Sequence, residues 1–213
     1  MKSRPILFSA PMVRALLDGR KTQTRRAVKP SGWQFEPTSG SLAYNWLDDM
    51  TPIWLFKPQD RSRFKWVPCP YGRTGDELWV RETFGEFVRR PGVPVYRADD
   101  PLALGSSNSW RPSIHMPRKY SRITLRITDV RVEPLQAISE TDAIAEGIEP
   151  VGEAWRSYEI IHEGPHKGKP NPHSAVPNRA ARTSYRELWE AINGPDSWTA
   201  NPWVWVVSFE VKS

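Results

Sequence analysis

The chain opens with a strand, a short helix and a basic string, all within residues 5–26, PILFSAPMVRALLDGRKTQTRR. The apolar run at 5–11 predicts a short buried strand that ends in a turn, and Pro11 suits the first turn of a helix. Three apolar residues then share one helical face: Val13, Leu16 and Leu17. Gly19 is a typical helix stop, so the basic residues of 20–26 should follow directly after the helix.

Further strands are expected at 77–84, 122–132 and 202–211, where apolar and polar residues alternate. A hairpin is expected at 88–97, around a Pro-Gly step. Two helices are predicted from a serine followed three residues later by an acid, one over 139–146 and one over 184–192. Strands outnumber short helices, which indicates an α+β fold with a small mixed sheet or barrel.

The length of 213 residues suits one domain, 1–213, with additions to its core. The chain holds 21 prolines and 11 tryptophans, and proline forbids long uninterrupted helices. Residues 31–74 and 149–182 show neither strand alternation nor helical period. We therefore expect both segments to be insertions, with long Trp- and Pro-rich loops.

The positive charge is concentrated at the N-terminus. Residues 1–30 contain eight Lys and Arg against one Asp, a net of +7, whereas the whole chain has a net charge of +6. A local basic cluster indicates a phosphate-bearing or otherwise anionic partner, although a solvated basic face has the same composition.

No apolar run approaches the roughly 18 residues that a membrane span needs, and the N-terminus lacks the pattern of a signal peptide. The single cysteine, Cys69, has no partner for an internal disulfide. These features predict a cytoplasmic protein without a membrane partner.

Two familiar kinds of site are not predicted. A phosphate loop needs an earlier glycine-rich turn directly before Gly-Lys-Thr, and here Arg20 separates Gly19 from Lys21. The spacing of His162 and His166 could place two imidazoles on one helical face, but a Gly-Pro step interrupts it. We therefore expect no metal and no cofactor.

Lys21 and Thr24 are the candidates for catalysis within the basic string. A threonine hydroxyl is a weak nucleophile that needs a base, and a lysine kept neutral by burial or by nearby cations can serve. Residues 21 and 24 would point to opposite faces of a regular strand. A joint role therefore requires a turn or bulge after Gly19; otherwise this is a basic strand that binds a ligand or faces solvent.

Six segments resemble ASCH-domain proteins, in the order typical of that family: 6–9, 13–26, 75–82, 121–125, 142–147 and 201–205. The most specific is the Gly-Arg-Lys-Thr-x-Thr-x-Arg string, and the length is similar to that of the long form common in bacteria and their phages. The resemblance implies a PUA-like fold, a small mixed β-barrel flanked by short helices, with a cleft for a nucleotide or RNA.

Some small bacterial members of that family are amidohydrolases that remove the acetyl group from acetylcytidine. Their catalytic lysine, threonine and glutamate match Lys21, Thr24 and Glu146 here. The resemblance also implies ligand contacts from five residues of the matching segments: Arg20, Arg25, Arg26, Arg81 and Glu82. For Arg81 and Glu82, a structural ion pair is as good an interpretation as a role in the cleft.

Two other functions remain open at this point. A non-catalytic module for single-stranded RNA would use the basic N-terminal segment and stack bases on tryptophans. A nuclease would have to act without a metal. The expected partner is a nucleoside, a nucleotide or single-stranded RNA.

Overall fold

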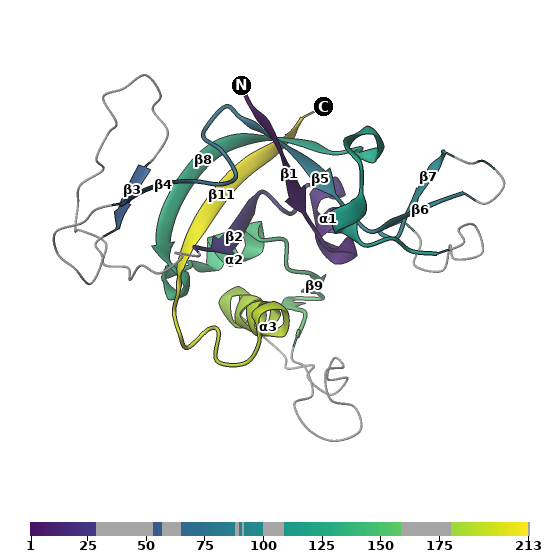
Figure 1. Cartoon of the computed structure of the whole chain (residues 1–213). Helices are drawn as coiled ribbons and strands as arrows, with labels where there is room; N and C mark the ends of the chain where they lie inside the picture. The colour runs from purple at the N-terminus through teal and green to yellow at the C-terminus, as the bar shows by residue number, and fades with distance from the viewer. Residues whose placement is uncertain are drawn as a thin grey trace.

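The computed structural model describes residues 1–28, 53–56, 65–87, 90, 92–99, 109–158 and 180–212 (Figure 1). For 53–56 and 65–67 only the backbone course is described. The His162 and His166 pair, and most of the two expected insertions, lie outside these residues. Within them, no helix is long and apolar enough to cross a membrane.

The described residues form a mixed α+β structure that is mostly β. The strands are β1 (Ser3–Leu7), β2 (Gln23–Ala27), β3 (Ile53–Phe56), β4 (Lys65–Pro68), β5 (Glu77–Arg81), β6 (Phe84–Glu86), β7 (Pro94–Tyr96), β8 (Thr124–Pro134), β9 (Pro150–Val151), β10 (Ala154–Trp155) and β11 (Trp203–Lys212). The helices are α1 (Ala10–Leu17), α2 (Glu140–Ala145) and α3 (Ala181–Asn193). Short 3₁₀ turns lie at Ser113–His115, Arg118–Tyr120 and Leu135–Ala137.

Five strands form the central sheet in the order β1-β5-β8-β11-β2. β1 and β5 are parallel and the other neighbours are antiparallel, so the sheet is mixed. The long pair β8 and β11 curves through the middle of the molecule (Figure 1). A bulge between Ser208 and Phe209 shifts the register of that pair.

The mixed α+β class is confirmed, but the described part of the chain contains no closed barrel. β1 and β2 are the two edges of the sheet, and no backbone ladder joins them. The link between these edges is a side chain: Arg26 of β2 donates from Nη2 to the Leu7 carbonyl of β1 at 2.7 Å.

Two hydrophobic clusters pack on opposite faces of β11, because successive strand residues point to opposite sides. Trp205 and Val207 join the cluster that contains the buried face of α1. Val204 and Val206 join the cluster of α2 and α3, which includes Tyr185. β11 is therefore buried on both faces.

The strand, helix and turn of the first unit form where the pattern predicts them, but Leu7 and Leu17, expected to be buried, are 41% and 52% exposed. Pro11 lies in the first turn of α1, and Asp18 caps its C-terminal end. Gly19 follows with a φ of +71°, a conformation that glycine adopts without steric cost. The chain turns there, and this turn delivers residues 20–24 to the sheet.

The structure corrects the start of the last helix. α3 begins at Ala181, with Ala180 as its N-cap, rather than at Ser184. The Ser184 side chain is buried and donates to the Arg156 carbonyl, while Glu187 accepts from the Tyr158 backbone N–H at 3.0 Å. The Ser–Glu pair therefore joins α3 to the segment after β10, because tertiary contacts use the groups that would otherwise cap a helix.

The strand expected at 77–84 is divided in two. β5 ends at Arg81 and β6 begins at Phe84. Between them, the Glu82 backbone N–H donates to Met116 Sδ at 3.2 Å. β6 then pairs with β7, so the expected hairpin forms but uses residues further from its Pro-Gly turn. Cys69, inside the segment expected to be an insertion, is buried in the first hydrophobic cluster.

Candidate functional site

A pocket of about 290 Å³ opens between the end of β1, the strand β2 and the helix α3. Lys21, Thr24 and Glu146 all line it, as do Arg25 and Arg26. The remaining wall is mainly apolar and comes from Phe8 and from one face of α3. Its volume is near the lower end for small-molecule sites.

The chain breaks its strand geometry between Lys21 and Thr24, which lets both side chains line one pocket. β2 begins only at Gln23, and Lys21 forms an isolated antiparallel bridge with Glu146. Between them, the Thr22 backbone N–H donates to the Ala145 carbonyl at 2.9 Å. This is the irregularity after Gly19 that a joint role requires.

The Lys21 ammonium is buried and saturated with acceptors. Nζ lies 2.9 Å from Glu146 Oε2, 2.8 Å from the Glu146 carbonyl oxygen and 2.7 Å from the Gln23 carbonyl oxygen. The side chains of the pair are 2% and 5% exposed. Burial lowers the pKa of Lys21 below its ordinary value although Glu146 opposes this, and the charges of Arg26 and Arg25 lower it further.

Glu146 reaches this position because α2 ends there. Ser139 caps the start of α2 by accepting from the Asp142 backbone N–H, and Glu146 is its C-cap. Gly147 follows with a φ of +82°. A β-carbon at this position would lie 2.7 Å from Lys21 Cβ, so only glycine allows the two segments to approach this closely.

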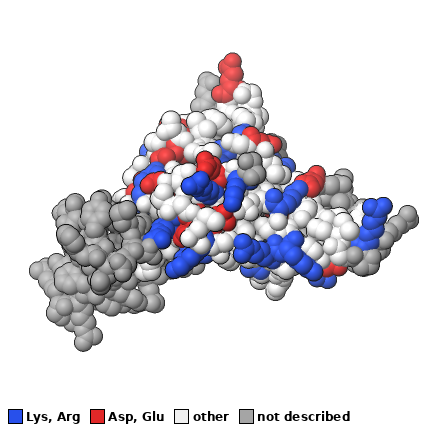
Figure 2. All heavy atoms as spheres, turned by 90° about the horizontal axis from the view of Figure 1, so that it is seen from above, with Lys and Arg blue, Asp and Glu red and all other residues white. Residues whose placement is uncertain are grey.

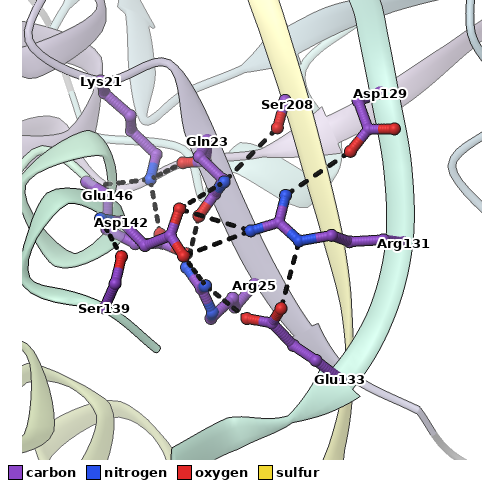
Figure 3. Close-up of polar contacts among 10 residues, drawn as sticks. All are labelled: Lys21, Gln23, Arg25, Asp129, Arg131, Glu133, Ser139, Asp142, Glu146 and Ser208. Carbon is purple, nitrogen blue, oxygen red and sulfur yellow. Dashed lines mark hydrogen bonds and ion pairs between the residues drawn. The ribbon is translucent and has the colours of Figure 1, made fainter. Parts of the chain in front are cut away.

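Arg25 connects the pocket to a layer of acids from β8 and α2 (Figure 3). Its side chain is fully buried, and Nη2 lies 2.6 Å from Glu133 and 3.1 Å from Asp142. Nη1 faces Glu146 Oε1 at 3.5 Å and also donates to the Gln23 side chain. Burial works to lower the pKa of Arg25, but Glu146 and Glu133 outweigh it and raise the pKa.

The same layer holds α2 on the sheet. Asp142 accepts from Gln23 at 3.2 Å and from Arg131 of β8 at 3.3 Å, besides its contact with Arg25 (Figure 3). Burial would raise the pKa of Asp142, but Arg25 and the hydrogen bonds outweigh it and the pKa is lowered. Arg25 thus belongs both to the pocket wall and to a structural ion-pair network.

The other two arginines of the basic string lie differently. Arg26 lines the pocket, and its guanidinium lies 5.5 Å from the centre of the Phe8 ring. Arg20 does not line it: Nη1 donates to the carbonyls of Gly147 and Ile148, and Nη2 pairs with Asp18. Arg20 therefore fixes the turn after α2 instead of facing the pocket.

Arg81 and Glu82, expected as ligand contacts, do not line this pocket. The buried Glu82 carboxylate pairs with Arg122 at 2.9 Å, not with Arg81. Arg81 donates to the Ile114 carbonyl and lies over the Trp79 ring. The break between β5 and β6 turns both residues toward the segments at 113–122, where their bonds are structural.

Two aromatic residues of the pocket were missed at the sequence level. Tyr185 and Trp189 lie one turn apart on α3, are 3% and 5% exposed, and both line the pocket. Their spacing predicts a buried helical face. It does not reveal that this face leaves a pocket against β2.

Four of the eight basic residues of the N-terminal segment are neutralised by ion pairs in the described part of the fold. Arg4, Arg20, Lys21 and Arg25 each pair with a carboxylate. On the face seen in Figure 2, the basic side chains form several separate groups, and acidic side chains lie among them. Across the described residues, no group of His, Cys, Asp and Glu is placed to hold a metal ion.

Comparisons with protein-family models, with curated proteins and with solved structures found no match to this chain.

Proposed function

We propose that this protein is a hydrolase that removes the acyl group from the exocyclic amine of an acylated cytosine nucleoside. The observation that carries the proposal is the buried Lys21–Glu146 pair, which shares one pocket with the Thr24 side chain. The substrate class comes from the resemblance to ASCH domains. We also propose that the fold is related to the PUA-like barrel. A barrel would join the two sheet edges, and here the Arg26–Leu7 contact links them.

In the proposed reaction, Thr24 Oγ1 forms a bond to the acyl carbon and gives its proton to the Lys21–Glu146 pair. The bond from the acyl carbon to nitrogen then breaks, and the proton passes to the departing amine. Water releases the acyl group from Thr24 as a carboxylic acid. The two partners lie 2.9 Å apart and are buried, so they act as one coupled acid–base unit.

The size and charge of the pocket favour a nucleoside over a long RNA. A cavity of about 290 Å³ accommodates a ligand of this class, but not a polymer. Two of its three cations, Lys21 and Arg25, already face carboxylates. Arg26 forms no ion pair among the described residues, so a single phosphate would bind beside it.

The test is to incubate the purified protein with N4-acetylcytidine and to measure cytidine and acetate by chromatography. Cytidine release is expected from the wild type and should fall at least about 100-fold in Thr24→Val, which keeps the branched shape but removes the nucleophile. Thr22→Val is the matched control, because exposed Thr22 does not line the pocket. Equal rates in Thr24→Val and the wild type would disprove the role of Thr24.

The pH dependence provides a second check. Because the Lys21 pKa lies below the ordinary value of 10.5, its neutral form is present at lower pH than for a free lysine. The rate should therefore rise with pH and level off below pH 10.5.

A different outcome would support the RNA-binding function. In that case the protein releases no cytidine but binds single-stranded RNA, with an affinity that falls steeply as the salt concentration rises.

A further inference from the structure

Tyr185 is a buried residue of the pocket with a hydroxyl group, and it takes no part in the proton transfers proposed above. It lies on α3, opposite β2, and its ring packs against Trp189 and Trp198 with centroid distances of 6.4 Å. None of the hydrogen bonds among the described residues involves its hydroxyl, so these rings hold it through packing. The hydroxyl thus remains available as a donor.

The proposed reaction needs a hydrogen-bond donor at one point. When Thr24 attacks, the electron pair of the acyl C=O bond moves to oxygen and creates an oxyanion, which needs a hydrogen-bond donor. Lys21 cannot readily provide it, because all three hydrogens of its ammonium group are directed at acceptors of the protein within 2.9 Å. The two terminal nitrogens of Arg25 are likewise committed to Gln23, Glu133 and Asp142, and only its buried Nε has no hydrogen-bond partner among the described residues.

We infer that Tyr185 is a further catalytic residue, whose hydroxyl donates a hydrogen bond to the oxyanion formed on the acyl oxygen. This inference rests on the proposed function. The hydrogen bond requires no proton transfer: when the intermediate collapses, the C=O bond re-forms, the C–N bond breaks and the amine takes the proton that left Thr24. Tyr185 is unchanged at the end of each turnover.

The surroundings of Tyr185 keep the hydroxyl in the protonated form that this role needs. Burial raises its pKa well above the ordinary value of 10, and the negative charge of Glu146 raises it further, against the opposing charges of Arg25 and Arg26. A hydrogen bond from a neutral donor is also strengthened where water is excluded. Tyr185 and its neighbour Trp189 are only 3% and 5% exposed, so little water reaches them.

The test compares hydrolysis of N4-acetylcytidine by the wild type, Tyr185→Phe and Tyr158→Phe. Tyr185→Phe keeps the ring packing and removes only the donor, so kcat should fall about 10²- to 10³-fold while KM changes little. Tyr158→Phe is the matched control, because its hydroxyl accepts from the Glu149 backbone N–H outside the pocket and its kcat should stay near wild type.

Each outcome supports or overturns the inference. An active wild type with an equally active Tyr185→Phe overturns the role of Tyr185 alone, whereas a wild type that releases no cytidine overturns both proposals. Should Tyr185→Phe fail to fold by circular dichroism, 2,3-difluorotyrosine at position 185 replaces it. Deprotonation of the phenol removes the donor, so activity should be lost at high pH. Because the fluorinated residue is more acidic, this loss should begin at a lower pH than in the wild type, and an unchanged profile counts against the inference.

Discussion

At the scale of single residues, the Lys21–Glu146 pair is the most consequential feature of the molecule. Taking an ammonium and a carboxylate out of water is costly, and their mutual attraction offsets this only with good geometry and further hydrogen bonds. Here Nζ has three acceptors within 2.9 Å. The pair is therefore tolerated in the interior, but neither partner is tolerated without the other.

We predict that Lys21→Met lowers the free energy of unfolding by about 3 kcal/mol, because it leaves the Glu146 charge buried without its closest partner. The double variant Lys21→Met/Glu146→Gln should recover part of that loss. Arg20→Met is the control, since it removes only a partly exposed pair with Asp18 and two hydrogen bonds of 3.3 Å to carbonyls, so its loss should be smaller. Urea unfolding measures all three, and equal losses for Lys21→Met and Arg20→Met would contradict the prediction.

Gly147 is the second critical residue. In Gly147→Ala the new β-carbon would lie 2.7 Å from Lys21 Cβ and 2.9 Å from Ala15 Cβ, both fixed close to the backbone. Gly75→Ala is the matched control, because Gly75 has a similar φ of +88° with nothing within 4 Å of the added carbon. Both variants should lose about 1–2 kcal/mol for the positive φ, and Gly147→Ala should lose clearly more in thermal unfolding.

At the scale of elements, the six-residue helix α2 is the support for the site. It is too short to be stable alone, so its cap and its contacts with β2 and β8 hold it in place. It contributes Asp142 to the ion-pair layer from its first turn and Glu146 to the pocket from its end. Its stability and the geometry of the site are thus linked.

We predict that Ser139→Ala destabilises the protein by about 1 kcal/mol, because it removes the oxygen that accepts from the Asp142 backbone N–H at 3.0 Å. Ser139→Asp retains an acceptor at that position and should remain close to the wild type. Urea denaturation at neutral pH provides the comparison. A loss of the same size in both variants would show that the cap bond is not the cause.

At the scale of the whole molecule, the open sheet depends on side-chain links at its edges. Arg26 joins the edge strands β1 and β2 on one side. Near the start of β1, the buried Asp76 accepts from the Lys2 backbone N–H at 2.7 Å and from Arg4 at 2.9 Å. These bonds supplement the backbone ladder of β1 with β5, its only strand partner in the described sheet.

Acid should weaken this edge. Burial would raise the pKa of Asp76, but the bonds from Lys2, Arg4 and Arg73 outweigh it, so the pKa lies below the ordinary value of 3.8. Its contribution to stability is therefore complete above about pH 3.8 and is lost as the pH falls through the lower, folded-state pKa.

The corresponding prediction is that Asp76→Asn is less stable than the wild type at neutral pH and that its stability changes less below pH 4. Asp129→Asn serves as the control, since exposed Asp129 contacts Arg131 only at 3.5 Å. Unfolding followed by circular dichroism over pH 2–7 gives the two profiles. Parallel acid profiles of Asp76→Asn and the wild type would rule out Asp76 as a source of the acid sensitivity.

The sequence alone was sufficient for the elements whose signals are local. The strand and helix before Gly19, the cap of α2 at Ser139 and the long strands β8 and β11 follow from periodicity and capping, which act between residues close in the chain. The need for an irregular turn between Lys21 and Thr24 was also evident, because strand parity sets it. The proposal of a role for Glu146 came only from a family resemblance.

Tertiary structure decided what depends on residues distant in sequence. It separated Arg20, which bonds the turn after α2, from Arg26, which lines the pocket, although both belong to one basic string. It placed Glu82 on Arg122 and brought Tyr185 to the pocket. The physical reason is that burial and pairing of a charge depend on partners distant in sequence, 40 residues away for Glu82 and Arg122 and 125 for Lys21 and Glu146, and local pattern contains no information about such partners.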